Sequence, residues 1–558
     1  MTRRGRAMKH ARTTLLICMA AACACLSAKA SADDVRGSHA GDPVPLYDNL
    51  GSLHHSITAG HPKAQQYFDQ GLRLVYAFNH EEAINSFEQA LTFDDKAAMA
   101  WWGIALALGP NINAAMGPAE ERRAFQAIQR AKSLVSNLSP SERAYIEALA
   151  IRYSGEPETG RADRDAAYAR AMEQVWKRFP GDADAGTLYA ESLMVLQPWD
   201  FWTPDGAPKG RATEIEGTLE RVLKLNPDHP GACHYYIHTV EASPHPERAL
   251  PCADRLPSLV PGAGHLVHMP GHIYLRLGRY REAAERNVHA AAVDHELLEH
   301  RKLTGIYPSG YYPHNVHFLW SALTMEGRSK EAIQAARDLA VLVPWEKAVE
   351  APPLEEFTPT LLFALTRFGR WNEVLELPKP PAGLPYTTAI WHYARGVSFA
   401  ALARFDAAQT EQRQLVELAT TLPKDRTVGV ASIRDLAQIA SDVLAGEIAA
   451  RQGHLDEAVR HLRAATMKED ALRYYEPPLW HYPVRHSLGA VLLQAGRAAE
   501  AEQVYRQDLK QHPENGWALY GLKESLLAQD KREEASAVQQ RFQKAWARAD
   551  IQLRASRL

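Results

Sequence analysis

The chain has 558 residues, of which 46% are hydrophobic and 23% charged, and its formal net charge is −3. This length is too great for one simple globular core, so several domains or a solenoid are expected. Without residues 1–32 the chain keeps 57 basic and 66 acidic residues, a net charge of −9, and this balance argues against a nucleic acid as partner.

The first 32 residues have the pattern of a secretory signal peptide. Basic residues precede an apolar stretch at 13–26 that is too short to span a membrane, and small-x-small cleavage sequences stand at 28–30 and 30–32. We therefore expect an exported protein, periplasmic or secreted, with a short N-terminal anchor as the alternative. No later stretch reaches 18 apolar residues, so no membrane span is expected in the mature chain.

Small and large residues recur at the spacing of a helix hairpin through most of the chain. With Ala501 at position 20 of a repeat, Gly489 falls at position 8, Tyr505 at 24 and Pro513 at 32. The small residues let two helices approach closely, and the proline ends the second helix. The turn sequence GRYREA at 278–283 returns as ARFDAA and GHLDEA. These residues resemble the tetratricopeptide repeat (TPR) family, over most of 64–550 in roughly nine to eleven degenerate repeats.

The resemblance implies an all-α fold, a right-handed superhelical solenoid of helix-turn-helix repeats. Such solenoids present a concave groove to a peptide or protein. The sequence divides into a signal peptide (1–32), a polar leader (33–62), N-terminal repeats (63–228), histidine-rich central repeats (229–375), a proline-rich linker (376–386) and C-terminal repeats (387–550).

Three irregular segments interrupt the repeat pattern. Residues 198–212 and 300–313 are insertions that bracket the histidine-rich region, and loops that break a repeat often lie on a functional face. The aromatic, proline-rich stretch 474–485 contains Glu476 and is a candidate to close the end of the solenoid against the groove.

Seven histidines fall on matching positions of three successive hairpins. His234 and His238 return 34 residues later as His268 and His272, and 34 is a known period of helix-turn-helix solenoids. A second pattern is a pair of histidines spaced i,i+3, which occurs at His265 and His268 and again at His314 and His317. The seven residues are His234, His238, His265, His268, His272, His314 and His317. Residues that repeat with the hairpin lie at the same height on neighbouring helices, so we expect these side chains to form one cluster.

A histidine cluster with a nearby carboxylate can bind a divalent transition metal such as zinc, copper, iron or manganese. Glu241 lies on the same predicted helix face as His234 and His238, and Glu191 lies on the preceding one. This donor set exceeds the needs of one tetrahedral site. Either two metals bind, or some of these residues only orient ligands or contact a substrate. The alternatives are histidine-rich packing without metal and a metal-free polar groove.

Four further residues are candidates to support such a site. Asn287 and Asn315 are predicted to orient ligand histidines, although a cap on a backbone group is the alternative for Asn287. Cys233 and Cys252 would remain after signal cleavage, on two antiparallel helices of one hairpin. In an exported chain they suggest a disulfide, with two buried free thiols as the alternative.

The preferred function is an exported TPR scaffold that binds a protein, a peptide or a small ligand in a groove with a metal site. The first alternative is a metal-dependent hydrolase or oxidase in which Glu191 or Glu241 acts as base or ligand. The second is metal binding or delivery in the periplasm, where Met194 and Met269 mildly favour copper. Whether the protein is an enzyme stays open, although the sequence shows no nucleophile elbow, phosphate loop or dinucleotide fingerprint.

Overall fold

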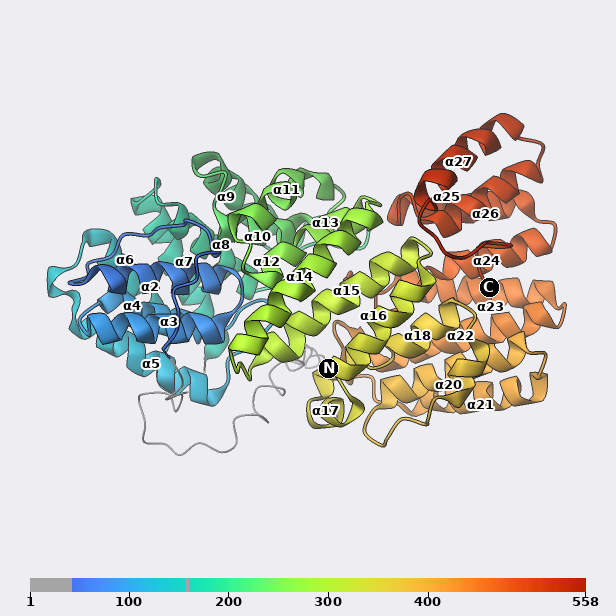
Figure 1. Ribbon diagram of the computed structural model, residues 1–558, viewed down its shortest axis with the longest axis horizontal. Coiled ribbons are helices and arrows are strands. Elements are labelled where there is room, and N and C mark those ends of the chain that lie inside the picture. The colour runs from blue at the N-terminus through green and yellow to red at the C-terminus, as the bar shows by residue number, and fades with distance from the viewer. Residues whose placement is uncertain (1–42, 157–159) are drawn as a thin grey trace, which may run out of the picture.

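The computed structural model describes residues 43–156 and 160–558, so the predicted signal peptide and the first part of the polar leader lie outside the described residues. Hairpin follows hairpin along the described chain (Figure 1). Figure 1 shows the N-terminal hairpins at one end of the molecule, the central hairpins in the middle and the C-terminal hairpins at the other end. The fold is all-helical, as predicted, and forms a solenoid.

The helices fall into three blocks. The N-terminal block contains α2 (Pro62–Tyr76), α3 (His80–Phe93), α4 (Ala98–Ala107), α5 (Pro118–Ser133), η1 (Val135–Asn137), α6 (Pro140–Ala150), α7 (Arg161–Arg178), α8 (Ala183–Val195) and α9 (Ala212–Leu225). The central block contains α10 (Pro230–Val240), η2 (Pro246–Ala249), α11 (Leu250–Leu259), α12 (Gly264–His268), α13 (Pro270–Arg276), α14 (Tyr280–His300), the π-helix η3 (Tyr307–Tyr311), α15 (Tyr312–Met325), α16 (Ser329–Leu342), α17 (Trp345–Glu350), η4 (Pro352–Glu356), α18 (Thr360–Arg367) and α19 (Trp371–Glu376).

The C-terminal block contains α20 (Pro385–Ala401), α21 (Phe405–Thr421), α22 (Ile433–Arg451), α23 (Leu455–Asp470), α24 (Val484–Gln494), α25 (Ala498–Gln511), α26 (Gly516–Leu527) and α27 (Arg532–Ala545). A short antiparallel pair, β1 (Thr427–Val428) and β2 (Ala431–Ser432), joins α21 to α22. No helix within the described residues is both long and apolar enough to cross a membrane.

Glycines allow the two helices of a hairpin to approach each other closely. A methyl group at Gly71 would lie 2.5 Å from the Phe87 ring, and one at Gly446 would lie 2.7 Å from the Leu462 side chain. Each pair joins a small residue on the first helix to a large residue on the second. The predicted small-large spacing of the repeat is therefore present in the packing.

A left-handed residue two positions before the second helix ends the first helix in eight of the described hairpins. The N–H of the following residue then bonds a carbonyl five residues earlier, as Arg279 does to Tyr274 (2.8 Å). These left-handed residues are Phe78, Gly278, Gly327, Gly369, Ala403, Gly453, Gly496 and Asp530. A left-handed backbone costs a residue other than glycine roughly 1–2 kcal/mol, and among these eight residues Phe78 is the one with a bulky apolar side chain.

Residues 43–60, here called the N-terminal strap, have no regular secondary structure but are firmly attached to the helices. The side chain of Glu142 accepts hydrogen bonds from the backbone and hydroxyl of Thr58 (2.6 and 2.7 Å). The backbone N–H of Gly262 donates to the carbonyl of Asn49 (2.8 Å). The strap therefore links the N-terminal hairpins to the central block.

A buried carboxylate makes the attachment of the strap depend on pH. Asp184 contacts His55 of the strap (2.8 Å) and His229 (3.0 Å), and it accepts a hydrogen bond from Tyr76 (2.6 Å). Burial raises the pKa of Asp184, but the hydrogen bonds from His229 and His55 outweigh burial and hold it below the usual value of 3.8. Burial lowers the pKa of His55, but the Asp184 carboxylate outweighs burial and raises it above 6.5.

We expect the strap to be held most tightly between about pH 4 and pH 6.5. Below this window Asp184 binds a proton when the strap is released, and above it His55 loses its proton when the strap is released, so attachment weakens as the pH moves toward the shifted pKa of either group. Hydrogen-exchange protection of residues 53–58, corrected for intrinsic rates, should be lower at pH 8 than at pH 6, and His55→Gln should remove this difference. Equal protection of the wild type at both values would contradict the prediction.

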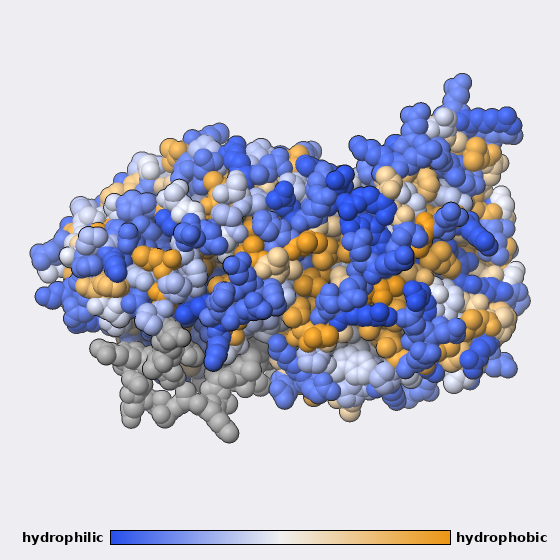
Figure 2. All heavy atoms as spheres, viewed as in Figure 1, coloured by the Kyte–Doolittle hydropathy of each residue, from blue (hydrophilic) through white to orange (hydrophobic). Residues whose placement is uncertain are grey.

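The segment between α23 and α24 reaches back to the central and N-terminal blocks. Tyr475 donates a hydrogen bond to Glu356 (2.7 Å), and Arg473 donates to the carbonyl of Trp199 (3.4 Å). Farther along, the Trp517 indole donates to the carbonyl of Thr324 (3.0 Å). In Figure 2, apolar side chains gather in the middle of the displayed face, near α15 and α16, where the blocks meet.

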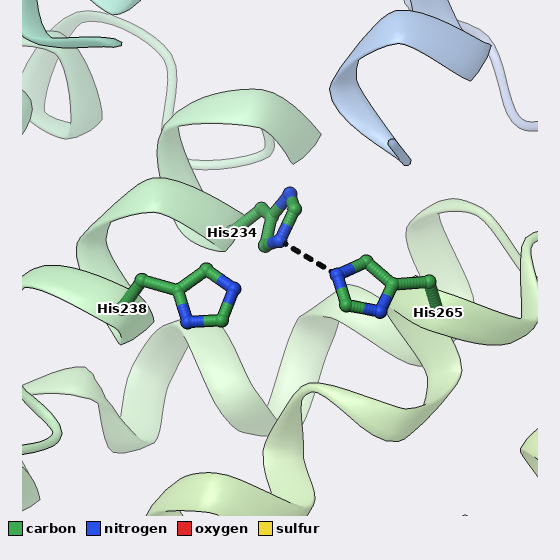
Figure 3. A group of neighbouring side chains, drawn as sticks. All are labelled: His234, His238 and His265. Carbon is green, nitrogen blue, oxygen red and sulfur yellow. Dashed lines mark hydrogen bonds between the residues drawn. The ribbon is translucent and has the colours of Figure 1, made fainter. Parts of the chain in front are cut away.

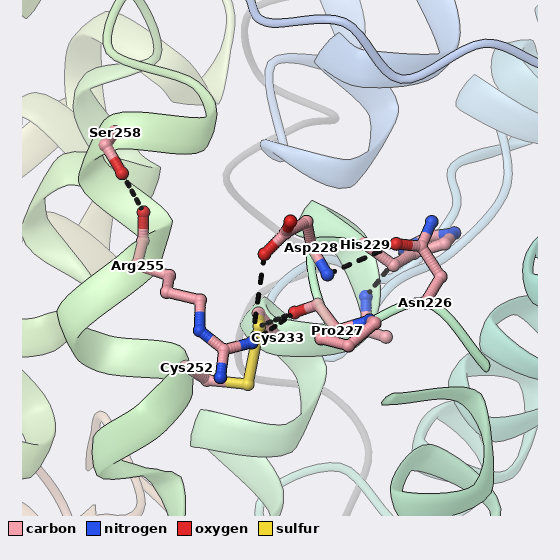
Figure 4. Close-up of a disulfide and its surroundings, with 9 residues drawn as sticks. Asn226, Pro227, Asp228, His229, Cys233, Cys252, Arg255 and Ser258 are labelled. Carbon is pink, nitrogen blue, oxygen red and sulfur yellow. Dashed lines mark hydrogen bonds and ion pairs between the residues drawn. A yellow bond between two sulfur atoms is a disulfide. The ribbon is translucent and has the colours of Figure 1, made fainter. Parts of the chain in front are cut away.

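The structure pairs Cys233 of α10 with Cys252 of α11 in a disulfide, as the sequence suggested (Figure 4). Their Cα atoms lie 5.0 Å apart, and both residues are buried. His234 directly follows Cys233 on α10, so the disulfide fixes the helix that carries the first histidines. After α11, α12 ends at His268 and α13 begins at Pro270, a residue that cannot donate a helical hydrogen bond.

Candidate metal centre

Six of the seven predicted histidines meet in two adjoining groups of three. The first set is His234, His238 and His265, and the second set is His268, His272 and His314. Within each set the candidate ligand atoms all lie within 4.8 Å of one another. Figure 3 shows the rings of the first set turned toward one another from α10 and α12. Both sets are groups that could hold a metal ion.

The second set repeats the first one hairpin later. In each set two ligands come from one helical stretch at spacing i,i+4, and the third comes from the next hairpin. His265 and His268 are three residues apart, yet His265 completes the first set while His268 begins the second. The two sets touch, because the ring centroids of His238 and His272 are 5.3 Å apart.

Burial keeps most of these imidazoles neutral. The rings of His234, His238, His265 and His268 are at most 2% exposed, and His314 is half-buried. Burial lowers the pKa of all five well below the usual value of 6.5, and the positive charge that neighbouring histidines would carry lowers it further. Neutral imidazole is the form that binds a metal.

His272 differs because two carboxylates lie beside it. Its Nδ1 is 2.5 Å from Glu241 Oε2 and 3.2 Å from Glu476 Oε2. Burial lowers the pKa of His272, but the two carboxylates outweigh burial and raise it to about 9. Without a metal, this ring is therefore protonated at neutral pH.

Hydrogen bonds fix the tautomer of two ligands. Nδ1 of His234 lies 2.7 Å from the carbonyl oxygen of Tyr76, at the end of α2. Nδ1 of His268 lies 2.7 Å from Oδ1 of Asn287, and the Asn287 amide donates to the Ala283 carbonyl (2.8 Å). Each Nδ1 faces an acceptor, so it carries the proton, and Nε2 keeps its lone pair. Asn287 thus contacts a histidine of the second set, which its predicted orienting role requires.

The Nε2 lone pair of His234 and that of His268 each face a ring nitrogen of another histidine. Nε2 of His234 is 3.1 Å from Nε2 of His265, and Nε2 of His268 is 3.0 Å from Nε2 of His272. A proton or a metal ion must lie between the two nitrogens of each pair, and in the second set the protonated His272 supplies that proton when no metal is bound. Two nitrogen ligands of a tetrahedral zinc ion lie about 3.3 Å apart, as bond lengths of about 2.0–2.1 Å require. The observed spacing is close to that value.

An unpartnered nitrogen completes the first set. Among the described residues, Nε2 of His238 is buried and has no hydrogen-bond partner, while its Nδ1 lies 3.2 Å from Glu241 Oε1. A buried polar atom without a partner is costly, and a metal ion would satisfy it.

Glu241 follows α10 directly and connects the two sets. Its oxygens contact Nδ1 of His238 in the first set and Nδ1 of His272 in the second. These three residues could also hold an ion themselves, but His238 and His272 would then leave the two three-histidine sets. Because His234 and His268 also direct Nδ1 to an oxygen, the geometry favours Glu241 as a carboxylate that orients two ligands.

One phenylalanine packs against each set. The Phe78 ring lies 4.5 Å from His234, 6.3 Å from His238 and 5.5 Å from His265, between ring centroids. The Phe318 ring lies 4.6, 4.5 and 4.9 Å from His268, His272 and His314. Trp199 of the predicted insertion also packs against His238 (5.0 Å). The surroundings of the ligands are therefore aromatic.

Three predicted residues lie away from both sets. His317 stacks on Trp320 (5.2 Å between centroids), and burial lowers its pKa to about 3. Glu191 is buried near Arg152, and burial raises its pKa to about 7 against the opposing charge of Arg152. Asn315 donates to Asp294 (2.6 Å) and contacts no ligand ring through a described hydrogen bond.

Besides the aromatic neighbours Phe318 and Trp199, three contributors to the two sets were not among the predicted site residues: Tyr76, Phe78 and Glu476. The first two come from the first hairpin, and Glu476 comes from the segment before α24. The proline-rich stretch 474–485 was the one sequence signal for any of them. The phenylalanine at a turn position that favours glycine is a second signal, visible once the turns are aligned.

Comparisons with known proteins identify the repeat. Residues 492–545 match the family model described as tetratricopeptide repeat. Similar solved structures include a human IFIT1 dimer with m7Gppp-AAAA (11% identity, 88% of this chain and 91% of that chain, TM-score 0.33) and yeast Tom70 (13% identity, 86% and 90%, TM-score 0.29). No curated protein matches the chain. The chain contains a segment, residues 492–545, that matches a tetratricopeptide repeat, within a fold built of helix hairpins.

Proposed function

We propose that this protein is an exported TPR scaffold that holds two transition-metal ions, one in each three-histidine set. The observation that carries the proposal is the pair of facing Nε2 atoms, 3.1 Å apart in the first set and 3.0 Å apart in the second. The unpartnered Nε2 of His238 adds a third donor to the first set. The repeats around the centre would offer their surface to a protein or peptide partner.

Copper is the metal that we propose. Imidazole ligands suit zinc, copper, iron and nickel, and among these metals copper is the one that proteins also bind in a monovalent state. Two divalent ions would bring four positive charges beside only two carboxylates that contact ligand rings, Glu241 and Glu476. Uncompensated charge is costly in a buried site. Two monovalent copper ions would balance the two carboxylates.

Elemental analysis of the mature protein, purified without added histidines, tests the proposal. We expect two metal ions per chain in the wild type, one in His234→Ala/His238→Ala and one in His268→Ala/His314→Ala. His317→Ala is the matched control, because this buried histidine lies outside both sets, and it should keep two. A wild type that binds no metal after reconstitution with copper, zinc, iron or manganese would overturn the proposal, and shared protons would then hold the rings together.

A second candidate function is metal-dependent catalysis. Each metal would have three protein ligands, which leaves a coordination position for a substrate or water. His314 is half-buried, so the second set is the one nearer to solvent. Azide added to the protein reconstituted with Co²⁺ should change its visible spectrum if that position is open. An unchanged spectrum would favour a closed, structural centre.

A further inference from the structure

We infer that Phe78 is a positioning residue of the first three-histidine set, placed in a strained turn so that its ring covers that set. The inference rests on the proposed function. It concerns why a bulky residue stands where the fold favours glycine.

The turn position itself does not require an aromatic residue. Five of the eight equivalent positions are glycines, and the other two besides Phe78 are Ala403 and Asp530, which are small or polar and exposed. Phe78 has a φ of +56° and is 2% exposed. A left-handed conformation is a genuine outlier for a bulky residue, and such outliers cluster at functional sites.

The Phe78 ring packs against the first set as a whole. Its centroid lies 4.5–6.3 Å from those of all three histidines, and the ring is close to parallel with His238 (12°) and His265 (25°). The carbonyl of Tyr76, two residues earlier, fixes the proton of His234. One turn therefore both orients a ligand and covers the set.

The second set has the same kind of neighbour, supplied by a different element. Phe318 stands on the regular helix α15 and contacts all three histidines of its set. An unstrained helix delivers one ring, and a strained turn of the distant first hairpin delivers the other. Phe78 and Phe318 share the contact with three histidines of one set. We therefore attribute the aromatic residue at position 78 to the first set and not to the turn.

The ring at Phe78 has two effects on a bound metal. It excludes water from one side of the first set, because a glycine there would leave that space unfilled. It also restrains the rotation of His234 and His265, so their Nε2 atoms stay aimed at one point. Removing the ring should therefore change both the affinity and the coordination geometry of this site.

The experiment compares Phe78→Gly and Phe78→Leu with Phe78→Tyr, which keeps a ring. Ala403→Gly is the matched control for the backbone change, because it introduces glycine at the same turn position far along the chain. The measurements are metal ions per chain after dialysis against a chelator, the visible spectrum of the Co²⁺-loaded full-length protein, and the melting temperature of the metal-free protein.

We expect Phe78→Gly and Phe78→Leu to weaken the first site at least tenfold, to retain one metal per chain where the wild type retains two, and to alter the Co²⁺ spectrum. Phe78→Tyr and Ala403→Gly should resemble the wild type. If both ring-deleting variants keep two metals and the wild-type spectrum, the inference is wrong while the metal centre stands. If Phe78→Gly does not fold, Phe78→Leu decides. A wild type without metal removes the proposed function and this inference together.

Discussion

Glu241→Gln is expected to weaken metal binding at both three-histidine sets by about 10- to 100-fold, the usual effect of losing a group that orients a ligand. One carboxylate contacts Nδ1 of His238 in the first set and forms an ion pair with Nδ1 of His272 in the second. Glutamine has the same shape but only one acceptor oxygen. Its NH₂ group would face the N–H of one histidine, donor against donor, and the negative charge would be lost.

Competition with a chromophoric chelator measures this effect for each of the two bound ions. Glu476→Gln is the control, because Glu476 contacts His272 of the second set. Glu476→Gln should lower the affinity for one ion and leave the affinity for the other unchanged. A lower affinity for only one ion in Glu241→Gln would contradict the role of Glu241 as a shared orienting group. Complete loss of one ion would favour Glu241 as a direct ligand.

The repeat period predicted most of the candidate ligands. A spacing of 34 residues placed His234 and His238 beside His268 and His272, and the structure brings all four into adjoining sets. Neighbouring hairpins of a solenoid contact each other directly, so sequence position translates into spatial position over one repeat. The same reasoning yielded the helical fold, because the small and large residues that set the hairpin spacing pack against each other.

The histidine pattern gave a wrong prediction for His317, because no further set of histidines follows the second one. The i,i+3 pair His314/His317 resembles His265/His268, in which one residue completes a set and the other starts the next. His314 completes the second set. His317 would start a third, but no other described histidine completes it, and its ring stacks on Trp320 instead.

The 34-residue repeat period could not predict contacts between residues that are many repeats apart in the sequence. Tyr76 is 158 residues from His234, and Glu476 is 204 residues from His272. These partners meet because the first hairpin and the segment before α24 fold back onto the central block. The repeat pattern describes hairpins that are neighbours along the chain. The return of distant segments onto the central block depends instead on the number of hairpins and on the angle between successive hairpins.

Removal of both metals is expected to destabilise the protein by roughly 5 kcal/mol. An ion held at 100 times its dissociation constant stabilises the folded state by about 2.7 kcal/mol, and there are two sites. The chelated protein should therefore melt several degrees lower than the loaded protein. His234→Ala/His238→Ala should show about half of this difference between its loaded and chelated forms.

Removal of the metals should also reduce protection from hydrogen exchange in particular segments, because the metal centre joins three parts of the chain. Tyr76 and Phe78 approach it from the first hairpin, Glu476 approaches from residues 471–483, and the ligands belong to the central block. Hydrogen exchange should therefore accelerate at 74–80 and 471–483 as well as at 230–318 when the metals leave, with α20–α22 as an internal control. Acceleration confined to 230–318 would mean that the outer segments close on the centre without the metals, and that hydrogen bonds and aromatic packing alone hold the three parts together.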